Sequence, residues 1–435
     1  MDPIVATFVV LALAVLGFLS GRIPLEVVAI GVALALWATG VLSLPAALAG
    51  FGDPTVLFIA SLFVVASALE RSGITRWLGG LVLERAGHRR VPVLVAVGLI
   101  AAVMTAFLSI NGAVAALVPV VAVIAGRARL PASQTMIPLA FIASAASLLT
   151  LTGTPVNVVI SELAEAETGR GFGFAEFALV GLPLLVVTVA VVAVLGGRLL
   201  PGRPDLAAPQ EYSRRETDTL SLVPESVRTG AIRTVATGTR RGARRTLVIT
   251  AIMILLLATG LLPPAVAGLL AAGALVLTRV VTLPDLYRDI SWTTLVLIAG
   301  MIPLSAAFLQ TGAAEVVADG VLSVVGSADP HLALLAVCTV TVLLGQFISN
   351  VATVLIVAPV ATALAANLDV SPLPFLMGLA VAGAAAFLTP VATPANLMVM
   401  APGGYRFGDY WRLGLPLAIL FLAAAVLYVP LIWPF

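Results

Sequence analysis

The sequence predicts an all-α polytopic membrane protein built from two inverted repeats, and three observations support this: composition, long apolar runs and an internal match. Of 435 residues, 61% are hydrophobic and 10% are charged, and the mean hydropathy is +1.15. Several apolar runs reach the roughly 18–20 residues needed to cross a bilayer. The first run, residues 4–19, has no basic segment before it and is too long for a signal-peptide core, so we interpret it as a retained span.

The chain matches itself at a nearly constant offset. Pro24 aligns with Pro263, which gives 263 − 24 = 239, and residues 150–157 align with residues 389–396 at the same offset. Polar residues that repeat at one spacing over more than half of each repeat are difficult to attribute to composition. We therefore expect two homologous transmembrane halves.

This match divides the chain into three parts. We expect a first transmembrane repeat in residues 1–198, a polar linker in residues 199–245 and a second, inverted repeat in residues 246–435. The linker is rich in Arg, Pro, Ser and Thr and has no sustained apolar period, so it is predicted to be cytoplasmic. Its charge is more typical of a positive-inside signal than of a nucleic-acid site.

Each repeat has the same predicted layout of three spans, a re-entrant hairpin, a broken helix and a final span. The elements of the first repeat follow in order: spans at about 4–20, 24–42 and 54–70, apolar pieces at about 91–108 and 112–126, an interrupted segment at about 136–163, and a final span at about 177–197.

The two apolar pieces that flank residues 109–112 could be two full crossings or one re-entrant hairpin. The chain has 23 Arg and no Lys. If the hairpin does not cross, each repeat crosses five times, the total is about ten crossings, and the second repeat is inverted. A cytoplasmic linker then places 23 − 1 = 22 arginines inside, with Arg170 outside, so the positive-inside rule favours the hairpin.

Both repeats contain a polar interruption where an unbroken helix is otherwise expected. Residues 150–157 read TLTGTPVN, and residues 389–396 read TPVATPAN. In each, a Thr precedes a Pro, which is typical of a helix start with Thr154 or Thr393 as the N-cap. Each break predicts a half-helix N-terminus inside the membrane, with N–H groups suited to an anion and nearby carbonyls suited to a small cation. A Thr-Pro kink without a ligand is the alternative, but its occurrence in both repeats favours a site.

These motifs resemble those of a known family. Ser109-Ile110-Asn111 and Ser349-Asn350-Val351, each ten residues before a proline, resemble its paired Ser-Asn-Thr signatures, and the two Thr-Pro breaks resemble its broken helices. The family is the divalent anion:sodium symporters, which carry citrate, dicarboxylates or sulfate, within the wider ion-transporter superfamily. Ile110 and Val351 stand where the signatures have Asn and Thr.

The resemblance implies two re-entrant hairpins, a homodimer in the lipid bilayer, and elevator-like movement of the hairpins and broken helices. It also implies that substrate lies at the two hairpin tips, with sodium between each tip and the neighbouring break. We expect a small anionic substrate to contact Asn111, Gly112, Thr154, Pro155, Asn350, Thr353, Thr393 and Pro394. We expect the coupling sodium ion to be held by Ser109, Asn111, Thr152, Gly153, Asn157, Ser349, Asn350, Thr389, Ala392 and Asn396.

The tips and breaks also bear on the driving ion and on competing functions. They contain hydroxyls, amides and unwound carbonyls but no titratable group, which favours sodium over protons. We expect a secondary transporter of the inner membrane that takes up a di- or tricarboxylate or a sulfate-like anion. An arsenite- or cation-handling antiporter or exporter of the same superfamily is the first alternative, and a channel is the second. An enzyme is not expected, because no His or carboxylate lies near the breaks.

Overall fold

The computed structural model describes most of the chain, and all regular structure in the described part is helical. The described residues are 2–20, 22–72, 90–107, 110–128, 130–202, 240–259, 261–325 and 329–435. Ser109, most of the predicted linker and the arginine-rich loop after residue 72 lie outside these ranges.

The helices of the first repeat occur where the apolar pattern predicts them. They are α1 (Pro3–Ser20), α2 (Leu25–Ala38), α3 (Leu44–Leu48), α4 (Pro54–Arg71), α6 (Arg90–Phe107), α7 (Ile110–Ala128), α8 (Met136–Ala146), α9 (Pro155–Thr168) and α10 (Ala178–Leu199). Some boundaries differ from the prediction. Helix α3 lies between predicted spans, α2 ends at Ala38 and α9 at Thr168 rather than at about 42 and 163, and α7 begins at Ile110 and so includes residues that were assigned to the hairpin turn.

The second repeat has a corresponding series of helices. They are α13 (Arg240–Thr259), α14 (Pro264–Leu277), α15 (Leu283–Asp289), α16 (Trp292–Thr311), α17 (Ala313–Val325), α18 (Pro330–Leu344), α19 (Asn350–Asn367), α20 (Leu373–Ala384), α21 (Pro394–Met400), α22 (Tyr410–Ala423) and α23 (Val429–Ile432). A π-helical turn, Ala424–Tyr428, joins the last two.

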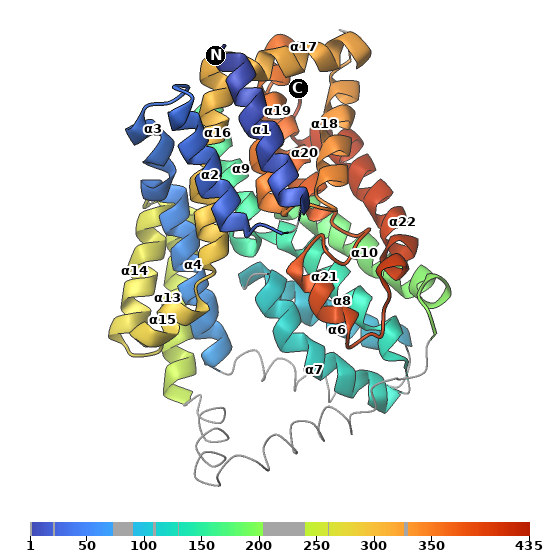
Figure 1. Ribbon diagram of the computed structural model, residues 1–435. Helices are drawn as coiled ribbons and strands as arrows, with labels where there is room; N and C mark the ends of the chain where they lie inside the picture. The colour runs from blue at the N-terminus through green and yellow to red at the C-terminus, as the bar shows by residue number, and fades with distance from the viewer. Residues whose placement is uncertain are drawn as a thin grey trace.

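The all-α membrane class is confirmed for the described residues. Seven described segments are long and apolar enough to cross a membrane, and further apolar helices are shorter. Both chain termini lie at the same end of the molecule (Figure 1), as an even number of crossings requires.

Helices α2, α4, α14 and α16 form one group in which the halves of the chain pack directly on one another. Helix α2 lies along α16, and α4 lies along α14. The first pair approaches so closely that a Cβ at Gly300 would lie 2.6 Å from the Ala29 carbonyl oxygen. Small residues at a helix interface permit such backbone contact and are common where membrane helices associate.

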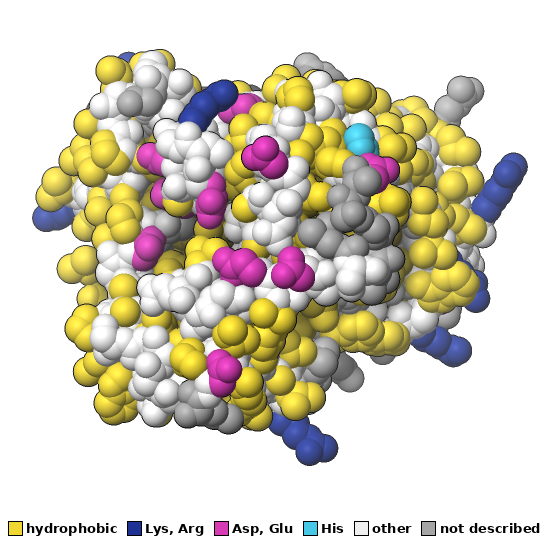
Figure 2. Space-filling model, turned by 90° about the horizontal axis from the view of Figure 1, so that it is seen from above, with side chains coloured by type: hydrophobic (Ala, Val, Ile, Leu, Met, Phe, Trp, Pro, Cys, Tyr) yellow, Lys and Arg dark blue, Asp and Glu magenta, His cyan; other side chains and the backbone are white. Residues whose placement is uncertain are grey.

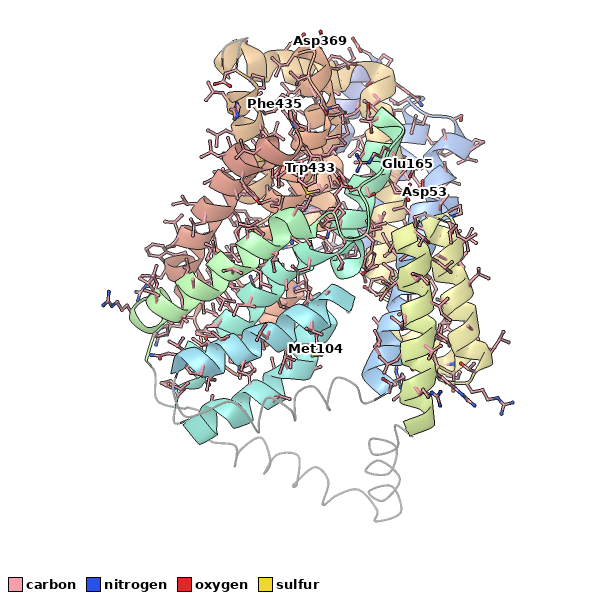
Figure 3. The ribbon with its side chains drawn as sticks, turned by 180° about the vertical axis from the view of Figure 1, so that it is seen from behind. Asp53, Met104, Glu165, Asp369, Trp433 and Phe435 are labelled. Carbon is pink, nitrogen blue, oxygen red and sulfur yellow. The ribbon has the colours of Figure 1, made fainter. Side chains whose placement is uncertain are left out.

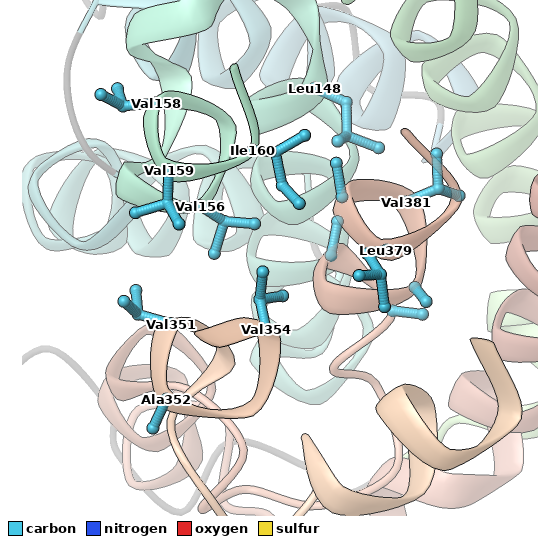
Figure 4. Close-up of a cluster of buried hydrophobic side chains, with 14 of the residues drawn as sticks. Leu148, Val156, Val158, Val159, Ile160, Val351, Ala352, Val354, Leu379 and Val381 are labelled. Atoms are coloured by element: carbon cyan, nitrogen blue, oxygen red, sulfur yellow. The ribbon is translucent and has the colours of Figure 1, made fainter. Parts of the chain in front are cut away.

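A second group contains both hairpins and both breaks and consists of α6 to α10 and α18 to α22. Helices α6 and α7 lie in the lower half of Figure 1 with α8 and α21, whereas α18 and α19 lie in the upper half with α9 and α20. The core of this group joins the two halves of the chain. Figure 4 shows Val156 and Val159 of α9 beside Val351 and Val354 of α19.

Charged side chains are distributed unequally between the two ends of the molecule. Acidic side chains gather on the upper face (Figure 2), and Asp53, Glu165 and Asp369 lie towards this end (Figure 3). At the opposite end, where α4 ends and α15 lies, Arg71 and Arg288 are found. This asymmetry is the one that the arginine distribution in the sequence predicts for the described residues.

Candidate functional site

The first break separates α8 from α9 by two short 3₁₀ turns, Ser147–Leu149 and Leu151–Gly153. Thr154 is extended, with φ −153° and ψ 148°, and its side chain accepts a hydrogen bond from the Val156 N–H. Pro155 follows at the first helical position. The predicted N-cap is therefore present, and the start of α9 has the Thr-Pro geometry inferred from the sequence.

Asn157 spans this break with its side-chain amide. The side chain is fully buried, and Nδ2 donates to the carbonyl oxygens of Ser147 and Thr150 at 2.8 Å each. The amide oxygen Oδ1 is also buried and has no hydrogen-bond partner. An unsatisfied buried oxygen is costly, so this atom is suited to a ligand such as a cation.

Two hydroxyls connect the first break to the first hairpin. Thr150 Oγ1 and Thr152 Oγ1 both donate to the carbonyl oxygen of Ala106, at 2.7 and 3.1 Å. Ala106 lies in the last turn of α6, just before the hairpin tip. These hydrogen bonds hold the break against the end of the first hairpin arm, three residues before Ser109.

The second break, between α20 and α21, repeats the central features of the first. Thr393 is extended, with φ −142° and ψ 150°, and its Oγ1 accepts from the Asn396 N–H at 3.1 Å. Asn396 Nδ2 donates to the carbonyl oxygens of Ala386 at 2.8 Å and Thr389 at 3.0 Å. These acceptors lie ten and seven residues before the Asn, the same spacing as in the first break.

The second break has one support that the sequence reasoning missed. Gln346, which is 2% exposed, accepts a hydrogen bond from the Leu388 N–H and donates to the Ala385 carbonyl oxygen. Its own carbonyl oxygen accepts from Thr389 Oγ1 at 2.7 Å. The signal was available, because an amide side chain in an otherwise apolar membrane segment marks a position with a specific partner.

A cavity of about 700 Å³ lies where the hairpin tips and the breaks meet. The structure brings ten of the predicted site residues to its wall: Asn111, Gly112, Gly153, Thr154, Pro155, Ser349, Asn350, Ala392, Thr393 and Pro394. Residues more than 280 positions apart in the chain thus face one space.

The other predicted site residues lie behind this wall or outside the described chain. Five are absent from the lining: Thr152, Asn157, Thr353, Thr389 and Asn396. Thr353 is fully buried in α19, and its hydroxyl has no partner. Asn350 lines the cavity, and its Oδ1 is also buried without a partner. Ser109 lies outside the described residues.

The opposite wall of the cavity comes from the other group of helices. It includes Phe63 and Ser67 of α4, Thr293 of α16 and Asp289 at the end of α15. Asp289 is the one charged residue among the described lining residues, and Arg71 is bound to it at 2.7 Å. Burial raises the pKa of Asp289, but hydrogen bonds from Ser67 and Arg71 outweigh this and hold the pKa below its usual range.

Comparison with protein families identifies the chain. A family model described as citrate transporter matches residues 15–332, which is 332 − 15 + 1 = 318 of the 435 residues. The chain belongs to the citrate transporter family. A second model, the sodium:sulfate symporter transmembrane region, matches residues 237–435. Membership of the divalent anion:sodium symporters, which the motifs indicated, is therefore confirmed.

Individual relatives of this citrate transporter family member are also transporters. The uncharacterized transporter YfbS of Escherichia coli is 26% identical, and the match covers 98% of each chain. A probable sodium/sulfate cotransporter of Chlamydomonas reinhardtii is 27% identical over 37% of this chain and 18% of its own length. Among solved structures, the YdaH transporter of Alcanivorax borkumensis, described as having an unusual topology, is similar with a TM-score of 0.55 and 16% identity, covering 89% and 88% of the two chains. The chain is a transporter and not an enzyme.

Proposed function

We propose that this transporter couples the entry of sodium to the uptake of a small di- or tricarboxylate or a sulfate-like anion, by an elevator-type mechanism. The observation that carries the proposal is the cavity, because both hairpin tips and both breaks line it.

The lining suits an anion that is bound without a basic side chain. No Arg or Lys is among the described residues that line the cavity. Three helices of 14 residues or more, α7, α9 and α19, begin at its wall with Ile110, Pro155 and Asn350. Their N-termini supply N–H donors and partial positive charge, and a bound cation would supply the rest.

The oxygens beside the cavity suit sodium better than protons. Asn157 Oδ1, Asn350 Oδ1 and Thr353 Oγ1 are buried and have no partner, and all three are neutral hard-oxygen ligands. A proton-coupled carrier needs a titratable group on the path, and Asp289 is already held by Arg71. We therefore assign sodium as the coupling ion.

The two walls of the cavity suit movement of one group of helices against the other. The tips and breaks would form the moving part, and α2, α4 and α16 the fixed part of a homodimer in the inner membrane. The lining includes Ser67 and Asp289, near the end of the molecule that carries Arg71 and Arg288, so we interpret this state as open to the cytoplasm. The placement of the first hairpin low and the second high in Figure 1 supports inverted repeats.

The coupling ion and the substrate can be tested together in proteoliposomes. Labelled citrate, succinate and sulfate are each offered under an imposed sodium gradient or an imposed pH gradient, at matched membrane potential. We expect sodium-driven accumulation of at least one of these anions. Uptake driven by the pH gradient in the complete absence of sodium would contradict the assignment.

The hairpin tips can be tested with Asn111→Ala and Asn350→Ala. We expect both variants to lose sodium-driven uptake, because each removes an amide at the cavity wall, while protein yield and oligomer size remain unchanged. Asn367→Ala is the matched control, since Asn367 ends α19 far from the tip and its amide donates to Asp319 at 3.1 Å at an exposed site. Normal uptake by both tip variants would remove the tips from the mechanism.

A further inference from the structure

Gln346 is a buried polar residue that does not line the cavity and that the transport scheme above does not use. We propose that it is a positioning residue, whose amide fixes the irregular backbone of the second break against the second hairpin. Its effect on uptake rests on the proposed function, but its effect on the backbone does not.

The side chain of Gln346 satisfies backbone groups on two elements at once. Oε1 accepts from the Leu388 N–H at 2.8 Å, and Nε2 donates to the carbonyl oxygens of Val342 at 2.7 Å and Ala385 at 3.2 Å. Val342 belongs to α18, whereas Ala385 and Leu388 belong to the break. The amide therefore joins the first arm of the hairpin to the unwound segment after α20.

These bonds continue towards the cavity through the backbone. The Gln346 carbonyl oxygen accepts from Thr389 Oγ1, and the Thr389 carbonyl oxygen accepts from Asn396 Nδ2. Asn396 in turn donates its N–H to Thr393, which lines the cavity. Gln346 itself precedes the tip residue Ser349 by three positions. A shift at Gln346 would move the tip and the break relative to each other.

The first repeat explains why a side chain is needed in the second. The hairpins align at an offset of 240, so the residue that corresponds to Gln346 is 346 − 240 = 106, an Ala without hydrogen-bonding groups in its side chain. There the segment Ser147–Leu149 forms a 3₁₀ turn. The corresponding residues of the second repeat, 386–388, are not helical, so their backbone groups require other partners.

A neutral amide is required because the site needs a donor and an acceptor together. Ionised Glu only accepts, so Gln346→Glu would face two carbonyl oxygens without a proton. Protonated Glu restores one donor, so acidification should return part of the hydrogen bonding that the ionised form loses. Two titratable side chains occur in α18, α19, α20 and residues 385–393, and both are in α18. His331 lies at the opposite end of α18, 346 − 331 = 15 residues from Gln346, and Cys338 is a buried thiol.

The experiment compares wild type with Gln346→Glu and Gln346→Ala at pH 7.5 and pH 5.5. Hydrogen exchange of residues 385–389, corrected for the intrinsic effect of pH, reports on the backbone, and uptake in proteoliposomes reports on transport. For Gln346→Glu we expect hydrogen exchange of residues 385–389 to be about tenfold faster than in wild type at pH 7.5, with most of the protection and uptake recovered at pH 5.5. For the alanine we expect faster exchange at both pH values.

Two further variants complete the test. Gln310→Glu makes the same chemical change at an exposed position near the end of α16 and should match wild type at both pH values. Thr389→Val removes only the hydroxyl bond to the Gln346 carbonyl, so it should raise exchange less and without pH dependence. Wild-type protection of residues 385–389 in both Gln346 variants would overturn the proposal. Absence of sodium-driven uptake in wild type would instead refute the proposed function and leave the exchange result valid.

Discussion

The two breaks share their central structure but differ in what supports it. In both, a Thr caps the second half-helix and an Asn amide spans the gap to carbonyl oxygens seven and ten residues earlier. The first break is closed by its own 3₁₀ turns and by the Thr150 and Thr152 hydroxyls, which donate to the Ala106 carbonyl oxygen of α6. Side chains from other elements hold the second, with Ser144 donating to the Ala384 carbonyl, Gln346 bound to Leu388, and Tyr410 donating to the Asn396 carbonyl.

This difference distinguishes two kinds of feature: those that the binding site itself requires, and those that one half of the chain needs to hold its break in place. Features present in both breaks are those that a ligand or a half-helix start demands. Features present in one break compensate for local backbone structure. The comparison therefore predicts that shared residues are needed in both halves and that supporting residues are needed in only one.

The largest effects are expected at the shared asparagines. Asn157→Ala and Asn396→Ala each remove two hydrogen bonds from a buried amide to backbone carbonyl oxygens of the break, so each should lower the free energy of unfolding by about 3 kcal/mol and abolish uptake. Thermal unfolding in detergent and uptake in proteoliposomes measure the two effects. Asn367→Ala, at the surface end of α19, serves as the control. If only one of the two asparagines proved necessary, the breaks would not share a common core.

A smaller and unequal effect is expected at the residue before each capping Thr. Gly153 lies so close to the preceding turn that a Cβ would be 2.2 Å from the Ser147 carbonyl oxygen. Gly153→Ala should therefore cost about 2–3 kcal/mol of stability. The equivalent Ala392 already carries a Cβ, and Ala392→Gly should cost about 1 kcal/mol through one lost methyl group and a more flexible unfolded chain.

The stability of Gly153→Ala and Ala392→Gly is measured by thermal unfolding, and their sodium affinity by the dependence of uptake on sodium concentration. Gly153→Ala should lower both the stability and the sodium affinity, because the turn that it distorts includes the Ser147 carbonyl oxygen to which the Asn157 amide donates. Equal tolerance at the two positions would show that the first break does not depend on its 3₁₀ turns.

The sequence predicted the shared features well because they are encoded locally. A Thr before a Pro specifies an N-cap and a first helical position within two residues, and this held at Thr154 and Thr393. The apolar runs likewise gave the helices and the membrane class, since both depend on composition over a short window.

The supporting contacts were not predictable in the same way. Ser144 and Ala384 are 240 residues apart, and Tyr405 of the second half donates to the Ser133 carbonyl of the first. Such partners are chosen by the folded backbone, so no sequence window contains the information. The opposite wall of the cavity, with Asp289 and its partner Arg71, was missed for the same reason.

The smallest effect is expected at Tyr410, which supports only the second break. Its hydroxyl donates to the Asn396 carbonyl oxygen at 2.6 Å, while its ring packs against Phe141 of the first half. Tyr410→Phe keeps the ring contact and removes one buried hydrogen bond, so it should cost about 1 kcal/mol. We expect a melting temperature lower by about 2 °C and a modest loss of sodium affinity.

The control for this variant is Tyr428→Phe, because the Tyr428 hydroxyl likewise donates to a backbone carbonyl oxygen, that of Leu179 at 3.2 Å, but this bond is exposed and does not involve either break. Both variants should lower stability slightly, since each loses one hydroxyl bond. Only Tyr410→Phe should change the sodium dependence, because its acceptor is the backbone of the Asn that spans the second break. A change of equal size in both would mean that Tyr410 acts on general stability, and the second break would then owe its geometry to Gln346 and Ser144 alone among the described side chains.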